Sequence, residues 1–217
     1  MRDNNYIHKL LWLAVFAIAM AFVEAAIVVY LRAIYYPDGF TFPLRAITDY
    51  KIVVEVLRET ATVFMLLSVA FLAGKNRWER FAYFMYSFGL WDIFYYVWLK
   101  VLVKWPASLF DWDILFLIPL PWISPVIAPV SISLLMIIFS ILILRLIHKG
   151  NDFKPTWFPI ILALSGITLI LYSFMCDVNA TLHQQMPRPY HYDLLIAGNG
   201  LFIAAFLTAY ARCRGNS

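Results

Sequence analysis

Long runs of apolar residues, separated by short stretches of charged or turn-forming residues, dominate the pattern along the chain. A helix that crosses a membrane needs about 20 predominantly apolar residues, because it rises about 1.5 Å per residue through a hydrocarbon core about 30 Å thick. The pattern therefore predicts an all-α, polytopic integral membrane bundle with six transmembrane helices. We expect them over residues 10–30, 52–72, 81–103, 129–147, 157–176 and 194–211.

The stretch before the fourth predicted helix interrupts this pattern. Prolines occur there at positions 119, 121, 125 and 129, and proline removes a helical hydrogen bond and clashes with the preceding turn. A single helix from Asp113 to Ile147 would also be about 50 Å long, far more than the bilayer core. We therefore predict a proline-broken external segment over residues 105–128, which is either re-entrant or lies at the membrane interface.

Composition agrees with this architecture and excludes several others. Hydrophobic residues make up 63% of the 217 residues and charged residues only 14%, whereas a soluble domain carries about 25% charged residues. A water-soluble domain, a disordered chain and a nucleic-acid-binding protein are therefore excluded. Six spans use roughly 120 positions, so we expect residues 1–217 to form a single transmembrane domain.

The charges divide unequally between the two predicted sides of the membrane. With the N-terminus inside, one side carries ten Lys and Arg and three acids, and the other carries seven Lys and Arg and ten acids. Cytoplasmic loops are enriched in Lys and Arg. We therefore expect a multi-pass protein of the cell membrane, plasma or bacterial inner, with both termini in the cytoplasm. The net charge of +4 is therefore the sum of a positive cytoplasmic side and an outer side on which acids are in excess.

Several of these acids lie inside the predicted spans. Glu24, Glu55 and Glu59 fall in the outer half of the first two spans, together with the basic Arg58, and Asp92 falls near the middle of the third. An ionised residue at the bilayer centre costs about 2.5–3.5 kcal/mol on insertion scales, so such residues usually face the bundle interior and have a functional role.

A polar stripe follows the third predicted span outward from its middle. Asp92, Tyr96, Lys100 and Lys104 are spaced four residues apart, which keeps them near one face of a helix. A purely structural polar network is the alternative, but one arginine cannot neutralise four carboxylates. The candidate ligand-binding or ion-binding residues are Glu24, Glu55, Arg58, Glu59, Asp92, Tyr96, Lys100 and Asp113.

Metal binding is a further hypothesis for this layer. The loop before the last span adds His183 and His191, which are eight residues apart and match no known zinc spacing. No histidine lies inside a span and no phosphate-binding loop occurs, so haem and nucleotide cofactors have no signal in the sequence. A metal ion is the remaining candidate cofactor, with Glu24, Glu59, Asp92, His183 and His191 as candidate ligands.

Three functions are compatible with these residues. The first is an outward-facing intramembrane carboxylate site that binds or transports a proton, a cation or a small molecule. The second is a membrane-embedded enzyme, metal-dependent or acid–base, that acts on a lipid or another apolar substrate. The third is a non-catalytic subunit or assembly factor of a membrane complex. Expected partners are the lipid bilayer, a small-molecule or ion ligand, and a second copy or a larger membrane complex, and no nucleic acid.

Overall fold

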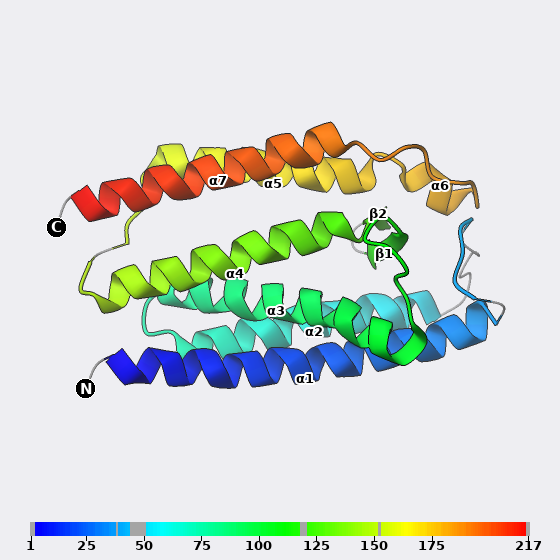
Figure 1. Cartoon of the computed structure of the whole chain (residues 1–217), viewed down its shortest axis with the longest axis horizontal. Coiled ribbons are helices and arrows are strands. Elements are labelled where there is room, and N and C mark those ends of the chain that lie inside the picture. Colours follow the sequence, from blue (N-terminus) through cyan, green and yellow to red (C-terminus); the bar gives the residue numbers. More distant parts are fainter. Residues whose placement is uncertain (1–2, 38, 44–50, 118–120, 152, 216–217) are drawn as a thin grey trace.

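A computed structural model of the chain describes residues 3–37, 39–43, 51–117, 121–151 and 153–215. Long helices lie side by side along its longest axis, with a short helix and two short strands near one end (Figure 1). The long helices are α1 (Asp3–Tyr35), α2 (Lys51–Ala73), α3 (Arg77–Val103), α4 (Ile127–His148), α5 (Trp157–Met175) and α7 (Tyr192–Gly215). The short elements are β1 (Trp112–Phe116), β2 (Trp122–Pro125) and α6 (Val178–Leu182).

Five of the described helices, α1, α2, α4, α5 and α7, are long and apolar enough to cross a membrane. The chain is therefore a multi-pass, mostly helical membrane protein. Helix α3, over the third predicted span, is 27 residues long, but Asp92 and Lys100 lower its hydropathy. It packs against α1, α2 and α4, and its Asp92 contacts Ser133 of α4, whereas Lys100 is exposed. The count of six spans stays a prediction.

The two ends of the bundle differ in what they contain. Both chain termini lie at one end, and the hairpin of β1 and β2 and helix α6 lie toward the other (Figure 1). We call the second of these the hairpin end. An even number of crossings would place the termini together in this way. Which end faces the cytoplasm stays a prediction.

The segment between α3 and α4 contains a β-hairpin instead of a helix. Strands β1 and β2 pair antiparallel, with Ile114 opposite Ile123, and the register shifts between Ile114 and Phe116. Isoleucine and aromatic residues favour strands, whereas proline excludes a helical interior. The prolines predicted an interruption, but not this hairpin. Residues 118–120 lie outside the described residues, and whether the segment is re-entrant or interfacial stays a prediction.

The helices approach one another closely where glycines face each other. A Cβ atom added at Gly166 of α5 would lie 2.7 Å from the carbonyl oxygen of Gly198 in α7. Farther along α7, the Phe206 ring stacks on Phe139 of α4, with centroids 4.1 Å apart and planes 4° apart. The glycine contact holds α5 against α7, and the stacked rings attach this pair to α4.

We expect Gly166→Ala to lower the free energy of unfolding by about 1–3 kcal/mol, the usual effect of overpacking a tight contact. The added methyl group meets a backbone carbonyl, which cannot rotate away as a side chain can. Gly200→Ala is the matched control, because nothing lies within 4 Å of a Cβ atom there. Equilibrium unfolding in mixed micelles measures both, and equal stabilities of the two variants would contradict this account of α5–α7 packing.

Candidate functional site

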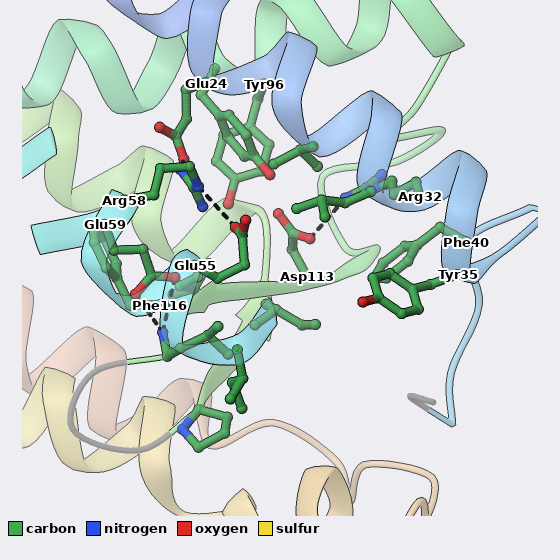
Figure 2. Close-up of a pocket in the computed structure, with 18 of the residues that line it drawn as sticks. Glu24, Arg32, Tyr35, Phe40, Glu55, Arg58, Glu59, Tyr96, Asp113 and Phe116 are labelled. Atoms are coloured by element: carbon green, nitrogen blue, oxygen red, sulfur yellow. Dashed lines mark hydrogen bonds and ion pairs between the residues drawn. The ribbon is translucent and has the colours of Figure 1, made fainter. Parts of the chain in front are cut away.

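A cavity of about 260 Å³ lies at the hairpin end, between α1, α2, α3 and the hairpin (Figure 2). We call it the carboxylate cavity, because five acids from four elements line it. Two arginines also line it, so among the described residues the acids exceed the bases by three charges when all are ionised. These charged residues are Glu24 and Arg32 of α1, Glu55, Arg58 and Glu59 of α2, Asp92 of α3 and Asp113 of β1.

Arg58 connects two of the helices that form the cavity. Its Nη1 donates to Oε1 of Glu24 on α1, and its Nε donates to Oε2 of Glu55 at 2.8 Å within α2 (Figure 2). Glu55 and Arg58 are three residues apart, so both side chains lie on the same face of the helix. A planar guanidinium has several donors in a fixed geometry, which suits it to two carboxylates at once. Arg58 therefore neutralises part of the charge of Glu24 and Glu55.

Glu59 holds the hairpin against the cavity through the backbone. Both of its carboxylate oxygens accept from the amide N–H of Leu117, at 2.9 and 3.2 Å (Figure 2). The side chain is buried, and no described basic side chain forms an ion pair with it. A buried carboxylate with a single neutral donor retains acceptor capacity for a cation.

Asp92 is the deepest acid along α3 and is bound by α4. Its Oδ2 accepts from the hydroxyl of Ser133 at 2.8 Å. Gly89, one helical turn earlier, makes this possible, because a Cβ atom there would lie 2.7 Å from the Ser133 carbonyl oxygen. The close approach of the two backbones brings the serine within reach. Asp92 likewise has no ion pair among the described residues.

Arg32 and Asp113 connect α1 to the hairpin. Arg32 Nη2 donates to Asp113 Oδ1 at 2.9 Å, and only 2% of the Asp113 side chain is exposed. The Arg32 guanidinium also lies 4.1 Å from the Phe40 ring centre and 3.8 Å from that of Trp105. Such contacts place a cation against the negative face of an aromatic ring. The ion pair and the rings together fix β1 at the mouth of the cavity.

Burial is the main influence on the ionisation of Asp113. Loss of hydration raises the pKa of its carboxyl to about 6, while Arg32 and the neighbouring Tyr96 hydroxyl act in the opposite direction. A buried carboxylate is disfavoured relative to its neutral form unless a cation or donors stabilise it. Asp113 is therefore ionised and paired with Arg32 above about pH 6.

Aromatic side chains form much of the remaining wall. Trp91, Tyr95 and Tyr96 of α3 face the cavity together with Phe116 of β1. The Trp91 and Phe116 ring centres are 6.2 Å apart, which is within the range of aromatic pairs. The cavity therefore combines an aromatic wall with the charged groups described above, and small-molecule sites likewise combine apolar walls with placed polar groups.

The structure brings together most of the residues predicted from the sequence, and separates three of them. Lys100 does not line the cavity. Its Nζ donates to the carbonyl oxygen of Pro106, which lies beyond the end of α3, at a distance of 2.7 Å. His183 is exposed, and its Nδ1 lies 3.1 Å from the backbone carbonyl oxygen of Asn179. His191 lies 3.6 Å from Asp193, also exposed.

The metal hypothesis gains nothing from this arrangement. The two histidines do not line the carboxylate cavity. Among the described residues, no group of three or more His, Cys, Asp or Glu side chains is placed to hold a metal ion. The five acids instead line the cavity from four elements, and Glu24 and Glu55 share Arg58 as their partner.

Sequence reasoning missed Arg32 and the groups that bind Glu59 and Asp92. Arg32 falls just past the end of the predicted first span, where a charge usually indicates only a membrane boundary. Ser133 and the Leu117 amide carry no signal in the sequence at all. Their roles depend on which segments the fold brings together.

No known protein family, curated protein or solved structure matches this chain. The residues of the carboxylate cavity are therefore the basis for a functional proposal.

Proposed function

We propose that this membrane protein binds a cation in the carboxylate cavity, as the first step of recognition or transport. The cation is a proton, a metal ion or a small positively charged molecule. The excess of acids carries the proposal, because five carboxylates and two guanidinium groups of the described residues line one cavity. A further positive charge would lower the repulsion among these acids.

The positions of two acids favour a ligand over a purely structural network. Glu59 and Asp92 are bound by an amide and a hydroxyl, and not by a basic side chain. In a structural network, we would expect each buried carboxylate to have its own cation or several donors. Both side chains also line the cavity and do not face lipid, whereas a subunit that contacts a partner through its acids would present them outward.

The test is cation binding by the double variant Glu59→Gln and Asp92→Asn. Hydrogen bonds to charged groups contribute about 1.5–3 kcal/mol each, so we expect the dissociation constant to rise at least tenfold. Calorimetric titration in nanodiscs with Na⁺, Mg²⁺ and methylammonium, together with proton uptake between pH 5 and 9, covers the classes of cation.

Glu79→Gln is the matched control, because Glu79 is a buried acid of α3 outside the cavity and binds only the Lys75 amide within its own turn. We expect this variant to bind like the wild type. Equal binding by the wild type and the double variant, or no cation binding by the wild type, would contradict the proposed function.

A further inference from the structure

The cavity already binds two organic cations, which are side chains of the chain itself. The Arg58 guanidinium lies between two carboxylates, and the Arg32 guanidinium lies against one carboxylate and two aromatic rings. Carboxylates and aromatic faces are therefore the groups that this end of the bundle uses to hold a delocalised positive charge. Each arginine forms ion pairs with acids of the cavity. Two of the five acids remain available to a third cation.

Those two acids, Glu59 and Asp92, come from different helices and both border the cavity. An aromatic residue precedes Asp92 in α3, and another precedes the residue that binds Glu59. Trp91 precedes Asp92 in α3, and Phe116 precedes Leu117, the residue whose amide binds Glu59. The Trp91 and Phe116 rings contact each other with centroids 6.2 Å apart. Both rings line the same cavity as these two acids.

The chemistry of this wall selects among cations. Calcium and magnesium are bound by six or more oxygen ligands at short distance, and aromatic rings supply none. An ammonium ion with an apolar body uses both features, because its charge pairs with carboxylates and its body and charge are attracted to ring faces. The volume of about 260 Å³ is below the range of roughly 300–1,000 Å³ for drug-sized ligands, so the ligand is small.

We propose that the ligand of the carboxylate cavity is a small organic ammonium ion with an aromatic or alkyl body. Its ammonium group lies against Glu59 and Asp92, and its body lies against Trp91 and Phe116. This inference depends on the proposed function, since it names the class of cation that the cavity binds. It goes beyond that function because it excludes inorganic cations as the main ligand.

The experiment compares molecules of one shape and different charge. The full chain is placed in nanodiscs of phosphatidylcholine and titrated calorimetrically at pH 7.5 with 2-phenylethylammonium, neutral 2-phenylethanol, NaCl and MgCl₂. We expect the ammonium ion to bind at least tenfold more tightly than the alcohol. We also expect neither salt, at equal ionic strength, to compete with it.

Three variants and one control variant test the placement of the ligand. Glu59→Gln combined with Asp92→Asn should weaken binding of 2-phenylethylammonium at least tenfold, and Glu79→Gln should leave it unchanged. Trp91→Leu and Phe116→Leu should each weaken binding several-fold. Trp91 is 5% exposed and belongs to the core, so Trp91→Leu could fail to fold. The more accessible Phe116 then still tests whether the aromatic rings contact the ligand.

The outcomes separate the two proposals. Binding of Na⁺, Mg²⁺ or protons that requires Glu59 and Asp92, without binding of the ammonium ion, would overturn this inference and leave the proposed function intact. Equal binding of the ammonium ion and the alcohol would also overturn it, because the acids would then contribute nothing. If no cation binds in a way that depends on these two acids, both proposals are wrong.

Discussion

Replacing Arg32 by methionine is expected to lower the free energy of unfolding by about 3–5 kcal/mol at pH 8, the usual effect of leaving a buried charge without its partner. The Asp113 side chain is 2% exposed, so water cannot replace the lost guanidinium. Equilibrium unfolding in mixed micelles, followed by circular dichroism, measures the change. We expect the hairpin to lose its attachment to α1 first, because Arg32 provides the ion pair between them.

The pH dependence of this effect follows from the raised pKa of Asp113. Its carboxyl has a pKa of about 6 in the folded protein and 3.8 as the ordinary value. Folding therefore favours the protonated form between these values, and stability from this group decreases as pH rises through them. Removing Arg32 raises the pKa further. The destabilisation by Arg32→Met should therefore be smaller at pH 5, where Asp113 is neutral, than at pH 8.

Two controls make this prediction specific. Arg188→Met removes an exposed arginine and should change stability by less than about 0.5 kcal/mol. The double variant Arg32→Met with Asp113→Leu removes both charges, and replacing a buried pair by apolar residues is often neutral. We expect it to recover most of the lost stability. A double variant as unstable as Arg32→Met alone would show that the ion pair is not the cause.

Arg58→Met is the second substitution with a large expected effect, again about 3–5 kcal/mol at neutral pH. It leaves two buried carboxylates without their shared cation, Glu24 on α1 and Glu55 on α2. These helices pack mainly on α3 and touch each other little, so Arg58 provides much of their direct connection. The same unfolding measurement applies, with binding of 2-phenylethylammonium as a second readout.

The neighbouring carboxylates provide the control for Arg58. Adding Glu24→Gln and Glu55→Gln to Arg58→Met removes the uncompensated charges, so this triple variant should regain stability. Arg58→Lys keeps the charge but cannot reach two carboxylates with a planar group, so we expect an intermediate stability. Wild-type stability of Arg58→Met would contradict the role of Arg58 as the connection between α1 and α2.

The hairpin is the clearest difference between what the sequence predicts and what the structure contains. The prolines predict that the helix stops, because that effect acts within one turn of the backbone. They do not predict that Trp112–Phe116 pairs with Trp122–Pro125. Pairing of strands depends on the neighbouring packing surface more than on local preference. Here that surface includes α5 and α4, which contact β2.

The residues of the candidate site show the same difference between sequence and structure. Glu24, Glu55, Arg58, Glu59 and Asp92 could be selected from the sequence, because an ionised residue within an apolar run is costly wherever it faces. The prediction for Lys100, by contrast, used helical spacing alone. The last turn of α3 carries this side chain past the cavity to the carbonyl of Pro106, a contact that spacing within the helix does not reveal.

The sequence by itself determined that this chain is a helical membrane protein, and it predicted which acids lie within the apolar helices and that most of them gather toward one end. These properties follow from the hydropathy and charge of neighbouring residues in the sequence. Apart from the local pair of Glu55 and Arg58, the tertiary structure alone decided which partner each acid of the cavity has. The decisive contacts join residues far apart in the chain, by 81 positions for Arg32 and Asp113, 58 for Glu59 and Leu117, and 41 for Asp92 and Ser133. Such contacts depend on how helices rotate and approach, which close packing sets and local sequence does not encode.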